Sequence, residues 1–379
     1  MFWVAAFALG YCILAGGAHG LSLLLAAPRC RRPRPPLAPP ADAPAVSIVQ
    51  PLCGVEPFLE ATLESAFALD YPNYDLIFCL ARADDPAAPY ARRAIERHAA
   101  RRARLLIADD RISQNPKLNN LAKGWKAARG PWIILADSNV LMPRDYVQRL
   151  MSAWGDRVGV VCAPPIGELP DTLAAEFECA FLNTYQARWQ FAAAACGLAF
   201  AQGKSMLWRR DILETQGGIT KLGDEPAEDA AATKLVRRAG LRPALARGSF
   251  PQPLGRRSWA EVWDRQARWA RLRRATFPLF FAPEILTSGL PAVGAAALGA
   301  WAMDWPAWAG ALALAIFWYG GEAALALYAG WRLRPATLLV MIARDAALPW
   351  LWAQAWSGDG FEWRGHAMSA APEEPRPAP

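Results

Sequence analysis

Residues 131–139 read Pro-Trp-Ile-Ile-Leu-Ala-Asp-Ser-Asn, a short apolar run that ends at Asp137. Similar short runs precede it along the chain, at residues 46–52, 75–80 and 104–108. Segments of helical character separate these runs, at residues 57–69, 87–102 and 116–128. Alternating strands and helices predict an α/β domain built on an open, mostly parallel sheet.

Acidic residues follow three of these predicted strands, and Asp109 and Asp110 come directly after residues 104–108. Asp137 comes directly after residues 132–136, and the pair Asp84 and Asp85 follows residues 75–80. In open α/β sheets a ligand binds outside the carboxyl ends of the strands. We therefore expect Asp85 and Asp137 to lie at a ligand-binding edge of the sheet.

Several enzyme classes are disfavoured by motifs that the sequence lacks. No GxGxxG follows the first strand and no GxxxxGK[ST] occurs, which argues against a dinucleotide dehydrogenase and a P-loop ATPase. The chain has three scattered histidines, and its seven cysteines form no CxxC pair. A Ser–His–Asp hydrolase and a zinc site are therefore not expected.

Arginines and carboxylates remain as the groups that could carry chemistry. Arg265, Arg268 and Trp269 are spaced i, i+3 and i+4, so a helix would place them on one face. Two guanidinium groups there could grip phosphate oxygens. Five further arginines flank them, so an amphipathic helix lying on a membrane is the other interpretation, and both can hold at once. The flanking residues are Arg256, Arg257, Arg271, Arg273 and Arg274.

The composition indicates hydrophobic ends around a domain of ordinary polarity. Of the 379 residues 54% are hydrophobic and 20% are charged, which excludes a disordered chain. Residues 2–27 carry no charge and four arginines follow at 29–34, so we expect a transmembrane anchor at 1–28 with a cytoplasmic basic, Pro-rich linker at 29–44. The net charge of +7 is concentrated beside such segments, so nucleic acid is not an expected partner.

The C-terminal part is apolar again. Residues 45–278 are predicted to form the catalytic domain, 279–357 membrane or interfacial helices, and 358–379 a partly disordered tail. Residues 279–357 are expected to cross the membrane either two or three times, because Arg344 and Asp345 interrupt the last apolar stretch. Such a pair either neutralises itself or faces a polar cavity.

Four short sequences together resemble the D,D,D,(Q/R)xxRW pattern of processive and lipid glycosyltransferases. They are Asp84-Asp-Pro, Asp137-Ser, Glu228-Asp and Arg265-Gln-Ala-Arg-Trp. Other stretches narrow the resemblance to ceramide glucosyltransferases, and the likeness is collinear over residues 46–269. These stretches are Pro51-Leu-Cys-Gly-Val-Glu-Pro, Leu69-Asp-Tyr-Pro-Asn-Tyr, Asn115-Pro-Lys-Leu-Asn-Asn-Leu and Gln202-Gly-Lys-Ser-Met.

The resemblance implies a fold and an activity. The fold would be GT-A, with the catalytic domain on the cytoplasmic side of a membrane, the inner membrane of a bacterium. The enzyme would move a hexose, with glucose as the first candidate, from a UDP-sugar to the primary hydroxyl of ceramide, with inversion to a β-linkage. A hopanoid N-acetylglucosaminyltransferase is the alternative. A processive polysaccharide synthase is a remote one, because it would need more transmembrane helices.

The resemblance also implies residues that bind the nucleotide sugar. Asp85, with Asp84 beside it, would hold the uracil or ribose part. Lys117, in the segment that begins at Asn115, would approach the nucleotide or its diphosphate.

The remaining implied roles concern the metal and the reaction. Asp137 would hold a divalent cation, Mn²⁺ or Mg²⁺, that bridges the diphosphate. Asn139 stands where many relatives have a second Asp, so weak metal affinity is expected. Asp229 would be the general base that takes the proton of the acceptor hydroxyl. The diphosphate and acceptor side would be lined by Arg265, Arg268 and Trp269.

Overall fold

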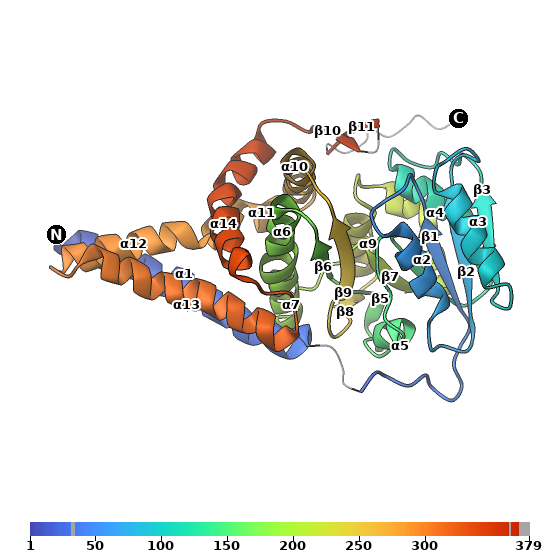
Figure 1. Cartoon of the computed structure of the whole chain (residues 1–379), viewed down its shortest axis with the longest axis horizontal. Helices are drawn as coiled ribbons and strands as arrows, with labels where there is room; N and C mark the ends of the chain where they lie inside the picture. Colours follow the sequence, from blue (N-terminus) through green and yellow to red (C-terminus); the bar gives the residue numbers. More distant parts are fainter. Residues whose placement is uncertain (32–34, 364, 371–379) are drawn as a thin grey trace. The chain divides into compact units, whose positions relative to one another are not determined.

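A computed structural model describes residues 1–31, 35–363 and 365–370 of the chain. The protein divides into two compact units, and Figure 1 labels most of their helices and strands. The sheet unit comprises Arg32–Leu169, Cys196–Gly255 and Gly360–Pro379. The helical unit comprises Met1–Arg31, Pro170–Ala195 and Arg256–Asp359.

The sheet unit is built on a seven-stranded sheet in the order β3-β2-β1-β4-β7-β5-β8. Strands β1 to β4 are parallel, and so are β5 and β8, whereas β7 runs antiparallel between β4 and β5. The prediction of a mostly parallel α/β sheet is confirmed. The strands are β1 (Val46–Pro51), β2 (Tyr74–Leu80), β3 (Ala103–Ile107), β4 (Trp132–Ala136), β5 (Val158–Cys162), β7 (Ser205–Arg209) and β8 (Arg242–Leu245).

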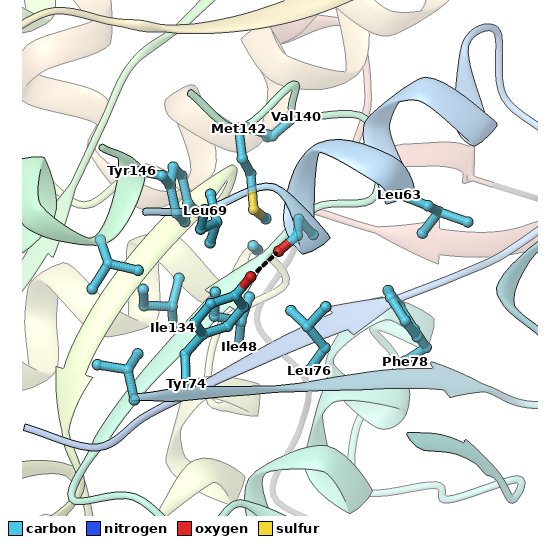
Figure 2. Close-up of a cluster of buried hydrophobic side chains, with 14 of the residues drawn as sticks. Ile48, Leu63, Leu69, Tyr74, Leu76, Phe78, Ile134, Val140, Met142 and Tyr146 are labelled. Atoms are coloured by element: carbon cyan, nitrogen blue, oxygen red, sulfur yellow. Dashed lines mark hydrogen bonds between the residues drawn. The ribbon is translucent and has the colours of Figure 1, made fainter. Parts of the chain in front are cut away.

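Helices cover both faces of this sheet, which explains why its central strands are apolar throughout. Successive residues of a strand point to opposite faces. Ile48 therefore packs with Leu76 and Ile134 on the side of α2, α3 and α5 (Figure 2), while Val49 packs with Ile77 on the side of α4, α8 and α9. The helices are α2 (Leu59–Phe67), α3 (Ala88–Arg97), α4 (Pro116–Ala127), α5 (Tyr146–Met151), α8 (Arg210–Thr215), the 3₁₀ helix η2 (Ile219–Gly223) and α9 (Glu228–Arg238).

The other described strands form two smaller sheets. Strands β6 (Pro165–Pro170) and β9 (Phe250–Gly255) pair with each other. Strands β10 (Gly360–Trp363) and β11 (His366–Ser369) form an antiparallel hairpin within the predicted tail. Residues 371–379 of that tail, and Arg32 and Arg34 of the basic cluster, lie outside the described residues.

The helical unit contains three described helices that are long and apolar enough to cross a membrane. They are α1, α13 and α14, and α1 contains the anchor predicted at 1–28. The unit's helices are α1 (Phe2–Cys30), α6 (Leu173–Ala180), the π-helix η1 (Phe181–Ala187), α7 (Arg188–Ala195), α10 (Trp259–Thr276), α11 (Pro278–Phe281), the 3₁₀ helix η3 (Ala282–Thr287), α12 (Gly289–Ala302), α13 (Ala307–Ala329) and α14 (Pro335–Trp356).

The first apolar stretch of the C-terminal part is broken, whereas the last one is continuous. The segments Pro278–Thr287 and Gly289–Ala302 are bent by 48° relative to each other, at an extended Ser288. The stretch that carries Arg344 and Asp345 is the unbroken helix α14, although the sequence left open whether this stretch crosses the membrane. Pro291 favours the break, because it has no N–H to donate to the carbonyl of residue 287 and its ring would clash with that carbonyl in a continuous helix. The charged pair of α14 is satisfied by neighbouring helices.

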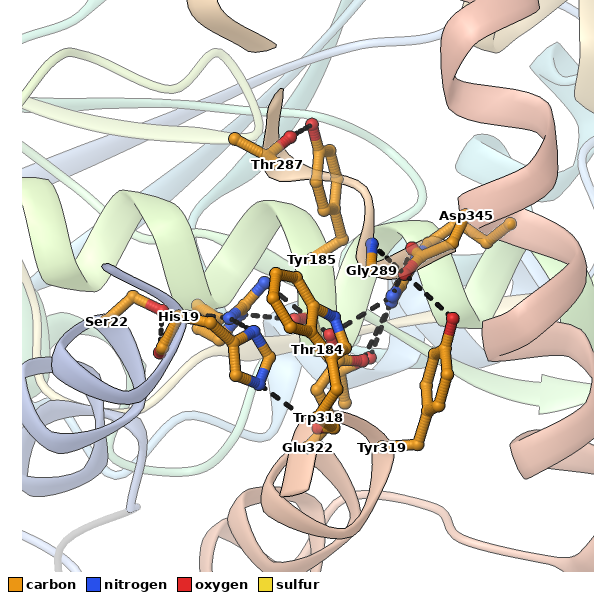
Figure 3. Close-up of polar contacts among 12 residues, drawn as sticks. His19, Ser22, Thr184, Tyr185, Thr287, Gly289, Trp318, Tyr319, Glu322 and Asp345 are labelled. Carbon is orange, nitrogen blue, oxygen red and sulfur yellow. Dashed lines mark hydrogen bonds and ion pairs between the residues drawn. The ribbon is translucent and has the colours of Figure 1, made fainter. Parts of the chain in front are cut away.

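Buried charges join four elements of this unit (Figure 3). Arg344 contacts Glu322 of α13 at 3.0 and 3.1 Å and Asp345 at 2.6 and 2.8 Å. Arg188 of α7 lies 3.5 Å from Glu322 and donates to Nδ1 of His19 in α1 at 2.8 Å. Since a guanidinium only donates, the Nε2–H of His19 donates in turn to a backbone carbonyl of α13. The Arg–Asp pair is thus neutralised within a wider buried network.

The helical unit also gathers segments from inside the range 45–278, which the sequence assigned to one catalytic domain. Residues 170–195 and 256–278 group with the apolar helices. Phe177 and Phe181 pack in one hydrophobic cluster with Val262, Trp318 and Met341, so their apolar side chains are buried against α13 and α14. Which residues constitute the catalytic domain stays a prediction.

Candidate active site

Asp137 lies at the carboxyl end of β4, where the sequence placed it. Its backbone N–H donates to the carbonyl of Lys204, which precedes β7. One carboxylate oxygen lies 2.6 Å from Nζ of Lys117 and the other lies 2.8 Å from Nζ of Lys204. The carboxylate is therefore compensated by two ammonium groups from different parts of the chain.

Lys117 is held in place by the start of α4. Asn115 caps this helix, because its side-chain oxygen accepts from the N–H groups of Lys117 at 2.9 Å and Leu118 at 3.2 Å. The ammonium of Lys117 lies 2.5 Å from Oε1 of Glu228 and 2.7 Å from the carbonyl oxygen of Gly203. Together with Asp137, three oxygens converge on this single cation.

Glu228 and Asp229 form the first turn of α9, close to the same lysine. The second oxygen of Glu228 accepts from the side-chain amide of Asn115 at 2.8 Å. Asp229 accepts from the backbone N–H groups of Gly203 at 3.0 Å and Ala230 at 2.8 Å. The structure thus brings Asn115, Lys117 and Asp137 together with the segment of Asp229.

The surroundings of these side chains shift their pKa values in different directions. Burial alone would raise the pKa of Asp137, but the charges and hydrogen bonds of Lys117 and Lys204 outweigh it and bring the pKa to about 2. Burial raises the pKa of Asp229 to about 6, and the negative charge of Glu228 acts in the same direction. The pKa of Lys117 is raised, because Asp137 and Glu228 more than offset its burial. Asp229 is therefore the carboxylate that can exchange a proton near neutral pH.

Asp85 lies beyond β2 and joins two strand-end loops. Its carboxylate accepts from the backbone N–H of Gly54, at 2.9 and 3.2 Å, and from that of Ala87 at 2.8 Å. Asp84 is exposed and pairs with Arg82 at 2.6 Å. Within the described residues, no contact brings Asp84 to Asp137 or Asp229, and its ligand-binding role stays a prediction.

Arg265, Arg268 and Trp269 lie on α10 in the helical unit, and all three are half-buried. The helix begins with a capping box in which Ser258 and Glu261 bind each other's backbone N–H groups. Arg265 donates to Glu178 of α6 at 2.6 Å. These three residues thus lie on one helix, as the sequence predicted. They belong to the helical unit, whereas Asp137 and Asp229 belong to the sheet unit.

Two residues of the site were not assigned by sequence reasoning. Lys204 binds Asp137 and also Oδ1 of Asn139 at 3.0 Å, and Glu228 binds Lys117. Lys204 lies in the Gln202-Gly-Lys-Ser-Met stretch and Glu228 in the Glu-Asp pair. Both residues therefore belong to motifs that the sequence analysis had already singled out. Glu228 lies in the first turn of α9, directly after Ala227 at the cap position.

The oxygen atoms around Lys117 are of the kind that a hard divalent cation takes as ligands. Carboxylates of Asp137 and Glu228 and a backbone carbonyl already surround one positive charge, which fits the chemistry of Mg²⁺ or Mn²⁺. In the part of the chain that the structure describes, no three His, Cys, Asp or Glu side chains gather into a metal-binding cluster.

Known proteins resemble this chain in sequence and in fold. Ceramide glucosyltransferase 1 of Caenorhabditis elegans is 28% identical over 258 residues, which are 66% of this chain and 55% of that protein. The ceramide glucosyltransferase of Komagataella phaffii is 28% identical over 248 residues, 59% of this chain and 49% of that protein. The chain thus spans about half the length of the curated relatives it matches.

The chain also resembles a solved structure and matches a family model. Mannosyltransferase PcManGT from Pyrobaculum calidifontis, solved with GDP-Man and Mn²⁺, covers 92% of this chain and 99% of its own. It is 22% identical with a TM-score of 0.53, which supports the GT-A fold. The model of "Glycosyl transferase family 21" matches residues 5–375. The chain belongs to glycosyl transferase family 21.

Proposed function

We propose that this protein is a membrane-bound, inverting glycosyltransferase that moves a hexose from a UDP-sugar to the primary hydroxyl of ceramide. Glucose is the first candidate for the hexose, and the product would be β-linked. The similarity to ceramide glucosyltransferases of an animal and a yeast supports the acceptor. The fold shared with a mannosyltransferase that was solved with GDP-Man is consistent with a nucleotide-sugar donor.

The state of Asp229 is the observation that carries the proposal. Its carboxylate is positioned by two backbone N–H groups, and burial holds its pKa at about 6. A general base works best with a pKa near the working pH, because it is then both ionised and able to accept a proton. Asp229 is thus suited to take the proton of an alcohol acceptor.

The reaction follows from this assignment. As the acceptor oxygen attacks the anomeric carbon of the sugar, its proton passes to Asp229. The bond between that carbon and the diphosphate oxygen breaks on the opposite side, so the anomeric configuration inverts and UDP leaves. Lys117 and Lys204 supply positive charge beside Asp137, and such charge stabilises a departing diphosphate. Asp85 would contact the nucleoside part of the donor.

A divalent cation, Mn²⁺ or Mg²⁺, would be held by Asp137. The oxygens near Lys117 fit such an ion, and the diphosphate would complete its coordination, since Mg²⁺ sites commonly combine one or two carboxylates with substrate phosphates. When bound, the ion would act as a Lewis acid on the leaving group. Asp137 has a pKa of about 2 and is thus ionised, as a metal ligand must be.

The helical unit would anchor the enzyme where its lipid acceptor resides. Three described helices can cross a membrane, and Arg29 and Arg31 lie at the end of α1. By the positive-inside rule this end faces the cytoplasm, where UDP-sugars are available. We propose a bacterial inner membrane as the location, with the catalytic groups on the cytoplasmic side.

The test is transfer by the purified protein in detergent. With UDP-glucose, ceramide and Mn²⁺, mass spectrometry should detect a hexosylceramide, and Asp229→Asn should abolish it while UDP still binds. Parallel reactions with UDP-N-acetylglucosamine and a hopanoid acceptor test the alternative. Product only in those reactions would reject ceramide as the acceptor, and full activity of Asp229→Asn would reject Asp229 as the base.

A further inference from the structure

Helix α6 buries two acidic side chains within an apolar segment. Glu176 is 6% exposed and Glu178 is fully buried. Each is paired with an arginine that lies far away in the sequence: Glu176 with Arg332 at 2.9 Å, and Glu178 with Arg265 at 2.6 Å. A buried carboxylate requires such compensation, because its desolvation is costly. Both pairs join a buried carboxylate of α6 to a guanidinium, and Glu176 also accepts a hydrogen bond from the hydroxyl of Thr337.

Arg265 is held by Glu178 through one nitrogen, Nη1. Among the residues that the structure describes, Arg265 makes no other side-chain hydrogen bond, and its side chain is 18% exposed. Arg273 on the same helix differs, because it binds Glu284 through both Nε and Nη2. A guanidinium has five N–H donors, so Arg265 keeps several of them available for an anionic ligand.

The environment of Glu178 keeps its carboxylate fixed. The other oxygen of Glu178 lies 4.0 Å from Nε of Arg257, so two positive charges face one buried carboxylate. Arg257 is itself held at the start of α10, where its backbone exchanges two hydrogen bonds with Thr172. Glu178 is therefore held by burial and by two positive charges, and the hydrogen bond that it accepts restrains the guanidinium of Arg265 on one side.

We propose that Glu178 is a positioning residue that restrains Arg265 for its contact with the diphosphate of the nucleotide sugar. This inference rests on the proposed function and on the role that the family resemblance implies for Arg265, which is to line the diphosphate side of the donor. An arginine restrained before the ligand binds loses less conformational freedom on binding. Glu178 itself touches neither substrate, because it is fully buried.

Two matched pairs of variants test the role. Glu178→Gln should lower kcat/KM for the UDP-sugar and weaken inhibition by UDP, each about tenfold or more, with KM for ceramide unchanged. Glu176→Gln removes a comparable buried charge from the same helix and should leave these constants as in the wild type. Glu178→Asp and Glu176→Asp retain the charge, and the first should show a smaller loss of the same kind.

A double-mutant cycle separates positioning from general structural damage. Because Glu178 acts through Arg265, Glu178→Gln should add no further loss in an Arg265→Ala background. A full additional loss there, or equal kinetics of the two Gln variants, would overturn the inference. If Glu178→Gln does not fold, equal kinetics of the two Asp variants would overturn it. A wild-type protein that transfers no hexose to ceramide would instead reject the proposed function.

Discussion

The ammonium group of Lys117 lies 2.6 Å from a carboxylate oxygen of Asp137, joining the start of α4 to the end of β4. The same nitrogen binds Glu228 and the carbonyl of Gly203, so one cation holds α9 and the loop before β7 in register with the sheet. Because Lys204 binds the other oxygen of Asp137, a phosphate that approaches this carboxylate meets two positive charges. The donor site is thus assembled around compensated charges.

Replacing Lys117 by Met is expected to weaken UDP binding about tenfold or more. The variant leaves Asp137 and Glu228 buried with one cation fewer, and their negative charge then opposes the diphosphate. Isothermal titration of the detergent-solubilised protein with UDP measures the effect. Lys126→Met, at an exposed position on the same helix, should bind UDP as the wild type does. Equal affinities of the two variants would contradict the role of Lys117.

The activity should depend on pH through Asp229. Burial and the charge of Glu228 raise the pKa of Asp229 to about 6, and only its deprotonated form can accept a proton. We therefore expect kcat/KM to fall about tenfold per pH unit well below pH 6 and to level off above it. Glu228→Gln removes a negative charge and should shift the fall to lower pH. Glu225→Gln serves as the control, because Glu225 pairs with Lys234 instead. A fall that stays at the same pH in Glu228→Gln would exclude this electrostatic coupling.

Local sequence patterns were sufficient to predict the first half of the sheet unit. The predicted strand 132–136 coincides with Trp132–Ala136, and the helix expected at 116–128 is Pro116–Ala127, which begins at a proline after an Asn cap. Alternating apolar runs and helix-start residues are local signals, so they can be recognised without knowledge of the fold.

Long-range contacts could not be predicted in this way. Lys204 reaches Asp137 because β7 inserts antiparallel beside β4, and no local pattern specifies that pairing. Glu322 of α13 pairs with Arg344 of α14, and no local pattern reveals an ion pair between two different helices. Residues 170–195 join the helical unit because of tertiary packing against α14 and α1, which helix propensity alone does not reveal.

Breaking the buried network should destabilise the helical unit. Glu322→Gln removes the carboxylate between Arg188 and Arg344, both of which are fully buried. Loss of one partner of a buried ion pair costs about 3–5 kcal/mol, because the remaining charge lacks compensation. Thermal unfolding in detergent should show a clearly lower Tm than for Asp304→Asn, which changes an exposed acidic residue. Equal Tm values would mean that the network contributes little to stability.

Gly203→Ala should damage the active site and leave the fold intact. A Cβ at this position would lie 2.7 Å from Oε1 of Glu228, 3.2 Å from Nζ of Lys117 and 3.3 Å from Oδ2 of Asp229. Glu228 cannot swing away freely, since Lys117 and Asn115 hold its two oxygens. The added methyl group must therefore displace the general base or the lysine.

Displacements of this kind cost up to about a hundredfold in rate, so we expect kcat/KM of Gly203→Ala to fall by about 10- to 100-fold. Its Tm should stay near that of Gly155→Ala, where an added Cβ meets no atom within 4 Å. Hexosylceramide formation and thermal unfolding, measured on the same preparations, separate the two effects. Wild-type turnover by Gly203→Ala would show that Glu228, Lys117 and Asp229 need not keep their present spacing during the reaction.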